Sequence, residues 1–145
     1  MTGNDAKIQD GWTVPRPASL EDAAARTLGG EPFDPLLREF LDEFYGGNSD
    51  LRARAIAAAP ARIAPIHDAY LAAVAEHLAL RFGLPVPQWV EEPDRFLTKP
   101  FFAGGLENLK AILLVESPLA FRRRQIFISA NALSRAREHA VSPPQ

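Results

Sequence analysis

The chain has 145 residues, 47% of them hydrophobic, a net charge of −2 and no cysteine. This length and apolar content suit one domain with a real core. The lack of cysteine excludes disulfides, thiolate nucleophiles and cysteine-ligated metal sites. A nearly neutral chain gives no overall indication of nucleic-acid binding. The N-terminus lacks the order of a signal peptide and no apolar run approaches the ~20 residues of a membrane span, so we expect a soluble, cytoplasmic protein without membrane contact.

The first eighteen residues differ in composition from the rest of the chain. They are polar, are interrupted by Pro15 and Pro17, and show no apolar period, which predicts a flexible N-terminal arm over residues 1–18. Trp12 is the exception, and we expect it to dock either on its own domain or on a partner. A single helical domain is predicted over residues 19–139, followed by a frayed tail over residues 140–145.

Two helices are predicted before residue 47. Ser19 followed by Asp22 resembles a capping box and predicts a short helix that ends at Gly29-Gly30. Asp34-Pro35 predicts the next start, with Asp34 as the N-cap and proline in the first turn. Apolar residues then recur at helical spacing as far as Gly46-Gly47, and we expect this stripe to face the core. Its members are Leu36, Leu37, Phe40, Leu41 and Phe44.

Two further helices follow. Residues 48–50 offer a cap before a helix over residues 51–59, which Pro60 closes. Pro65 is expected in the first turn of the longest helix, which ends at Gly83. Its many alanines favour helix and permit close approach of neighbours, so we expect this to be the central helix.

The remainder mixes irregular and regular segments. Prolines and aromatic residues between 84 and 102 predict a packed, irregular central connection. Helices are expected over residues 106–115, over 119–124 after a Ser117-Pro118 cap, and from 129 or 131 to 139. Residues 126–128 are β-prone and predict either a short strand or an extended crossing. The fold class predicted is therefore mainly all-α, a compact multi-helix single domain with a proline- and aromatic-rich central connection, and one short strand near 126–128 stays open.

Two pairs of a histidine beside an acid on the longest helix, His67-Asp68 and Glu76-His77, are the first candidates for acid/base chemistry. His67 and His77 are ten residues apart, which at 100° per residue places them about 80° apart around the axis and nearly three turns apart along it. They cannot share one metal ion, and neither forms a known metalloprotease pattern. An enzyme would need His67, Asp68 and His77 in one pocket with Glu91 or Glu92.

Three acids close together, Glu91, Glu92 and Asp94, are candidate oxygen ligands for a divalent cation. Their spacing does not match a calcium loop, and adjacent acids beside prolines are usually solvated. The glycine pairs at 29–30 and 104–105 lack the further residues of phosphate-binding loops. We therefore predict no catalytic residue, no metal site and no cofactor.

Charge is concentrated in one segment near the C-terminal end. Residues 117–137 hold five arginines and no acid, and three of the arginines are consecutive. On a helix, Arg122, Arg123 and Arg124 fan over about 200°, so at most two can face one surface. Three interpretations stay open: an intramolecular clamp onto a carboxylate such as Glu116, a protein interface, or phosphate contact with nucleic acid.

Residues 116–128, with the sequence ESPLAFRRRQIFI, resemble a segment of uncharacterised bacterial proteins. The order over residues 66–79 and 83–89 resembles them too, as do the Arg95-Phe96-Leu97 and Pro100-Phe101-Phe102 elements. In many such proteins this helical module follows a helix-turn-helix domain, in regulators that look like antitoxins encoded beside a nucleotidyltransferase-like toxin. The likeness covers about residues 63–136 and carries no catalytic residue.

Residues 19–62 contain no evident basic recognition helix, so the resemblance implies the module and not DNA binding. We therefore expect a small non-enzymatic protein-interaction module, antitoxin-like or regulatory, with a protein partner that the resemblance suggests is toxin-like. Self-association stays open. The alternatives are a nucleic-acid-binding accessory protein using the arginine-rich segment and, less favoured, a small enzyme. The residues selected as partner-binding or clamping are Arg122, Arg123, Arg124, Glu116, Trp12 and Trp89.

Overall fold

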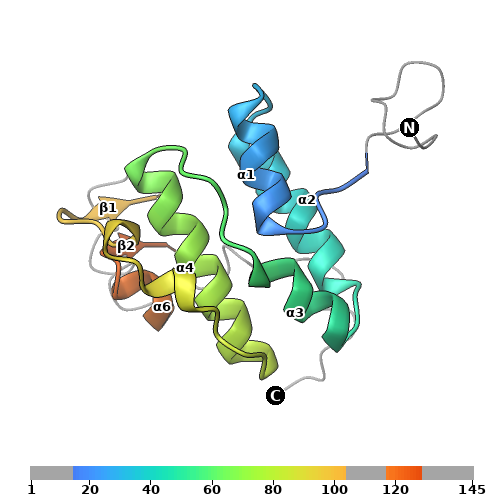
Figure 1. Ribbon diagram of the computed structural model, residues 1–145. Coiled ribbons are helices and arrows are strands. Elements are labelled where there is room, and N and C mark those ends of the chain that lie inside the picture. Colours follow the sequence, from blue (N-terminus) through green and yellow to red (C-terminus); the bar gives the residue numbers. More distant parts are fainter. Residues whose placement is uncertain (1–14, 104–116, 129–145) are drawn as a thin grey trace.

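A computed structural model describes residues 15–103 and 117–128, and this part of the chain is mainly helical, as predicted (Figure 1). The predicted helices over 106–115 and 129–139, most of the N-terminal arm and the C-terminal tail lie outside the described residues. The described helices are α1 (Leu20–Leu28), α2 (Phe33–Tyr45), α3 (Ser49–Ala57), α4 (Pro65–Phe82) and α6 (Leu119–Arg122). The described residues also form two 3₁₀ turns, η1 (Gln88–Glu91) and η2 (Pro93–Arg95), and two short strands, β1 (Phe101–Phe102) and β2 (Ile126–Phe127).

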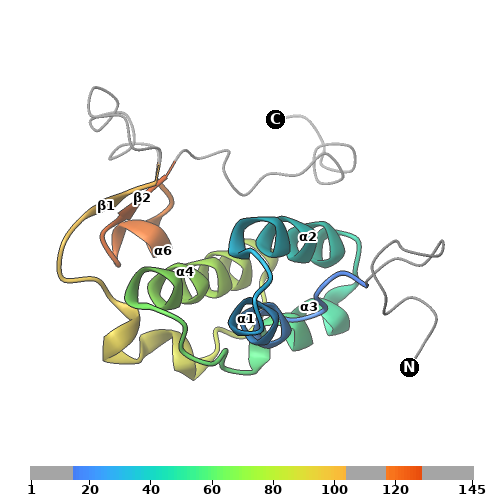
Figure 2. The same ribbon diagram turned by 90° about the horizontal axis from the view of Figure 1, so that it is seen from above.

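Helix α4 is the centre of the molecule, as predicted. Helices α1, α2 and α3 lie on one side of it, and α6 with the two strands lies on the other (Figure 2). Its buried residues include small alanines and two acids, Asp68 and Glu76. One apolar cluster runs from Leu20 of α1 to Ile128 after β2 and joins both sides through α4. No helix among the described residues is long and apolar enough to cross a membrane.

Most helix ends follow the predicted signals. The Ser19 hydroxyl accepts a hydrogen bond from the Asp22 amide at 3.0 Å, and the Asn48 side chain accepts one from the Leu51 amide at 2.9 Å. Gly83 ends α4 in the left-handed conformation, with φ of 67°. The predicted N-cap at Asp34 is wrong, because α2 begins at Phe33 after Pro32 and has no side-chain cap.

The end of the described chain departs further from prediction. Residues 126–127 do form a strand, β2, which pairs in parallel with β1 in the register Phe101 to Ile126. Ser117 does not cap α6. Its hydroxyl instead donates to the Ile128 carbonyl and accepts from the Ile128 amide, both at 2.7 Å, which ties the segment before α6 to the end of β2. Helix α6 ends at Arg122, before the expected Arg124, because the chain turns at Gln125 with φ of 61°.

Candidate functional site

Arg124 lies inside the domain and points at α4. Its side chain is completely buried, and its Nη1 donates to Glu76 Oε1 at 2.6 Å and to the Ala120 carbonyl at 2.8 Å. Nη2 donates to the Val90 carbonyl at 2.7 Å. Burial lowers the pKa of the Arg124 guanidinium, although the hydrogen bond to Glu76 opposes that shift. This arginine therefore joins α6, α4 and η1 from within.

Arg123 binds the same carboxylate from the surface. Its Nη1 donates to Glu76 Oε2 at 2.6 Å, and its Nη2 donates to Glu91 Oε1 at 2.9 Å. The hydrogen bonds that Arg123 donates to Glu91 and Glu76 raise the pKa of Arg123, and the bond to Glu91 lowers the pKa of that carboxyl. The Phe96 ring covers both guanidinium groups, with its centroid 4.5 Å from Cζ of Arg124 and 5.5 Å from Cζ of Arg123. We call Glu76, Glu91, Arg123 and Arg124 the arginine clamp.

The clamp accounts for two of the three consecutive arginines. Arg122 is exposed and forms no ion pair within the described residues. The carboxylate at the centre of the clamp is Glu76 on α4, a residue that sequence reasoning treated only as an acid/base candidate. Glu116 lies outside the described residues, as does Trp12. Of the three consecutive arginines, only Arg122 is therefore left without an ion pair among the described residues and could contact phosphate.

Trp89 is part of a second buried arginine site. The indole Nε1 donates to the Ile56 carbonyl at 3.1 Å, and the ring is only 7% exposed. The fully buried Arg95 lies over this ring at 4.7 Å and donates to the Pro60 carbonyl at 2.7 Å. Sequence reasoning did not select Arg95, although Arg95-Phe96-Leu97 was among the elements of the resemblance. Together these contacts fix the connection after α3 against η1 and η2.

The structure does not gather the residues that an enzyme was expected to use. His67 packs on the Phe33 ring at 4.6 Å, whereas His77 faces Phe121 at 6.2 Å. Burial, and the charge of Arg81, lower the pKa of His77. Asp68 accepts the Ile63 amide at 2.7 Å and so holds the start of α4.

The acids of the central connection are held by arginines. Arg62 binds Glu92 and Asp94, both at 2.8 Å, and Glu91 belongs to the arginine clamp. Arg95 Nε also donates to Glu92 Oε1 at 3.2 Å. The hydrogen bond from Arg123 lowers the pKa of Glu91, those from Arg95 and then Arg62 lower the pKa of Glu92, and that from Arg62 lowers the pKa of Asp94. Within residues 15–103 and 117–128, no group of three or more histidine, aspartate or glutamate side chains could hold a metal ion.

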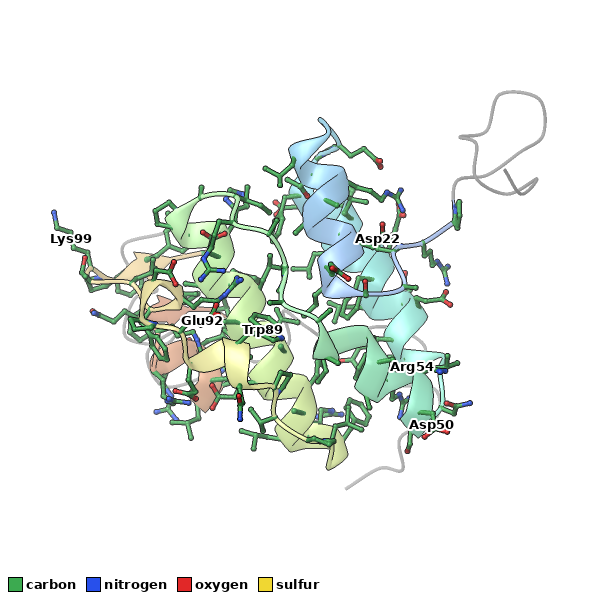
Figure 3. The ribbon with its side chains drawn as sticks, in the orientation of Figure 1. Asp22, Asp50, Arg54, Trp89, Glu92 and Lys99 are labelled. Atoms are coloured by element: carbon green, nitrogen blue, oxygen red, sulfur yellow. The ribbon has the colours of Figure 1, made fainter. Side chains whose placement is uncertain are left out.

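An apolar groove of about 520 Å³ opens between the end of α3 and the proline-rich connection after α4. We call it the α3 groove. Its lining residues are small or apolar apart from Arg54 and Gln88: Ala53, Arg54, Ala57, Ala59, Pro85, Pro87, Gln88 and Trp89. Arg54 projects from the outer side of α3, and Trp89 lies further in (Figure 3). Val86, between the two prolines, is 41% exposed.

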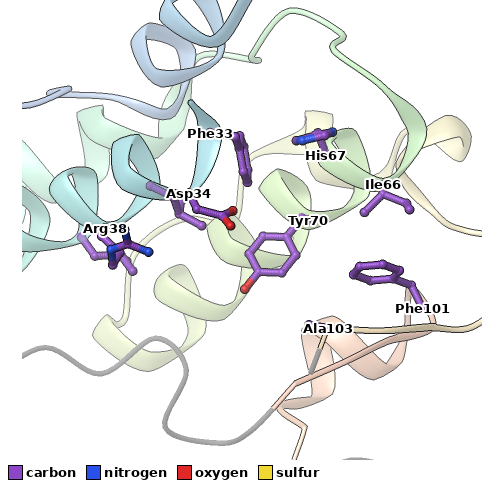
Figure 4. A pocket seen from close by; sticks show the side chains of 10 residues that line it. Phe33, Asp34, Arg38, Ile66, His67, Tyr70, Phe101 and Ala103 are labelled. Carbon is purple, nitrogen blue, oxygen red and sulfur yellow. The ribbon is translucent and has the colours of Figure 1, made fainter. Parts of the chain in front are cut away.

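A second pocket of about 450 Å³ lies between the first turns of α2 and α4 and strand β1. We call it the α2–α4 pocket. The described residues that line it combine aromatic and aliphatic walls with four polar side chains (Figure 4): Phe33, Asp34, Leu37, Arg38, Leu41, Ile66, His67, Tyr70, Phe101 and Ala103. Burial, and then the Asp34 charge, raise the pKa of Tyr70 to about 12, so its hydroxyl stays protonated at neutral pH.

Comparison with known proteins adds no identity. No protein-family model matches the chain, and neither a curated protein nor a solved structure matches it.

Proposed function

We propose that this chain is a non-enzymatic protein-interaction module that binds an apolar segment of a partner protein in the α3 groove. The observation that carries the proposal is the groove itself, an open apolar surface of about 520 Å³ with a tryptophan in its wall. Contacts between proteins concentrate on such surfaces, where aromatic side chains anchor the partner.

The groove is built on rigid elements. Ala53 and Ala57 are one helical turn apart on α3, so both small side chains face the same side and allow a partner backbone to approach. Opposite them, Trp89 is fixed by its hydrogen bond to Ile56 and by Arg95. A surface held in this way loses little conformational entropy when a partner binds.

Charge indicates what the partner segment carries beside its apolar residues. Arg54 is exposed and lines the groove. Within residues 15–103 and 117–128 it has no ion-pair partner, and no acid of these residues lines the groove. An acidic residue flanking the apolar segment would pair with Arg54 at the rim. The resemblance to antitoxin-like regulators supports a toxin-like protein as the partner.

The arginine clamp weighs against the nucleic-acid alternative. Arg123 and Arg124 are neutralised by Glu76 and Glu91, so they have little charge left for phosphate. We therefore propose binding to a protein, and not to a nucleic acid, as the function.

The test compares two alanine-to-glutamate variants. Ala57→Glu puts a buried charge into the bound complex, whereas Ala25→Glu alters an exposed position on α1. Partners from the host are recovered with the wild-type chain, and each purified candidate is titrated calorimetrically against all three proteins. We expect at least tenfold weaker binding for Ala57→Glu and unchanged binding for Ala25→Glu.

Arg54→Glu should weaken the same complex, increasingly so at low salt. Recovery of self-associated chain alone would overturn the proposal, and so would a partner that binds Ala57→Glu as tightly as wild type. Circular dichroism of Ala57→Glu and Arg54→Glu checks that the helical fold is retained.

A further inference from the structure

Two charged side chains of opposite sign, Asp34 and Arg38, line the α2–α4 pocket. Asp34 and Arg38 are four residues apart on α2 and therefore lie on the same side of the helix. Both are exposed, both line the pocket, and neither forms an ion pair or a side-chain hydrogen bond within the described residues. In Figure 4 the Asp34 carboxylate points towards Tyr70, and the Arg38 guanidinium lies beyond it along α2.

The rest of the pocket offers hydrogen-bond acceptors and aromatic walls. The Tyr70 hydroxyl has no partner within the described residues and lies near the middle of the pocket (Figure 4). The buried His67 Nδ1 also lacks a partner there. Phe33, Tyr70 and Phe101 supply rings, and the Phe33 and Tyr70 rings meet edge to face at 6.3 Å. A volume of about 450 Å³ is in the range of small-molecule sites.

We propose that the α2–α4 pocket binds an α-amino acid with an aromatic or branched apolar side chain. The ammonium group pairs with Asp34 and donates to the Tyr70 hydroxyl, and the carboxylate pairs with Arg38. The apolar side chain packs among Phe33, Ile66 and Phe101. This ligand class follows from the opposite charges on one side of α2 beside an apolar cavity.

Simpler ligands match the pocket less well. An organic cation would gain from Asp34 and from the aromatic rings, but it would be repelled by Arg38. An apolar carboxylate would pair with Arg38, but it would lie beside the Asp34 carboxylate, which repels it. Only a ligand carrying both charges pairs with both residues, so the three ligand types can be separated by experiment.

The test uses the full chain and three compounds with the same phenyl ring: L-phenylalanine, phenethylamine and 3-phenylpropionate. Binding is measured by NMR titration, following the signals of Tyr70 and Phe33. We expect saturable binding of L-phenylalanine at least tenfold tighter than that of either single-charge compound, because each charge-assisted hydrogen bond adds about that factor. The absence of saturable L-phenylalanine binding would overturn the proposal, as would equal binding of all three compounds.

Variants test the two pairings separately. Asp34→Asn and Arg38→Gln should each weaken L-phenylalanine binding about tenfold, whereas the matched change Glu39→Gln, on α2 but outside the pocket, should leave it unchanged. Equal affinity of Asp34→Asn and wild type would contradict the assignment. Ala57→Glu in the α3 groove should bind L-phenylalanine normally, so this proposal and the proposed function can fail independently.

Discussion

At the scale of single residues, two fully buried arginines, Arg95 and Arg124, connect separate elements of the structure. Arg124 is fully buried, yet three hydrogen bonds satisfy its Nη atoms and the Glu76 carboxylate balances its charge. A buried pair of this kind adds modest net stability, but removing one partner leaves the other charge without compensation. We therefore expect its main effect to be specificity, favouring the packing of α6 on α4 in which Glu76 and Arg124 are joined.

Glu76→Gln is expected to destabilise the protein by about 3 kcal/mol, because it removes the counter-charge of a buried guanidinium. The measurement is the free energy of unfolding in urea at neutral pH. Glu91→Gln is the matched control. The Glu91 side chain is 53% exposed, so its pair with Arg123 should contribute less than about 1 kcal/mol. Equal losses in the two variants would show that Arg124 does not depend on Glu76.

The clamp illustrates what the sequence did and did not reveal. Helical geometry alone indicated that the three arginines could not all face one surface. The carboxylate could not be predicted, since Glu76 lies 48 residues before Arg124 and only the packing of α6 on α4 brings them together. In the sequence Glu76 stood out only through its neighbour His77, whereas Glu116, the acid nearest the arginine run, was the local choice.

His77 predicts a pH dependence of stability. Its folded-state pKa is lowered by burial, whereas in the unfolded chain the pKa returns to its ordinary value near 6.5. Between these two values the unfolded state binds more protons, so stability is lost as the pH falls below about 6.5. We expect urea unfolding between pH 8 and 5 to show a shallower decline for His77→Gln than for wild type. An identical decline in both proteins would refute the assignment to His77.

At the scale of elements, helix ends were the best-predicted features because their signals are local. Ser19 and Asn48 cap the amides three residues ahead of them, and Gly83 adopts a conformation that favours glycine. Ser117 failed as a cap because its hydroxyl is taken by Ile128, a residue eleven positions away. Strand β1 was missed for the same reason, since its partner β2 lies beyond α6.

Gly83→Ala should destabilise the protein by about 1 kcal/mol, because alanine is strained at φ of 67°. No atom lies within 4 Å of the added Cβ, so the cost comes from the backbone alone. Gly29→Ala is the control. Gly29 has φ of −80°, and its added Cβ would make only ordinary contacts, so we expect no loss and up to about 0.5 kcal/mol of gain. Thermal unfolding of both variants measures the difference, and a comparable loss for Gly29→Ala would contradict this explanation.

At the scale of the whole molecule, α4 unites two halves that the sequence presents one after the other. The α3 groove and the α2–α4 pocket each draw residues from elements that are far apart in the chain. Their lining residues were visible in the sequence, mostly as core or turn positions. Their convergence was not visible, because it depends on how α2, α3 and the proline-rich connection pack around α4.

A continuous core predicts that the two sides of α4 unfold together. The apolar cluster includes residues of α1, α2, α3, α4, α6 and β2, and Trp89 contacts the end of α3 from η1. In a Trp12→Phe variant, fluorescence reports Trp89 alone, while far-UV circular dichroism reports all helices. We expect the two signals to give the same urea midpoint, since a single core unfolds as one cooperative unit. If α1–α3 formed a unit separate from α4 and α6, the circular dichroism signal would instead change in two steps. The change in Trp89 emission would then accompany only one of these steps.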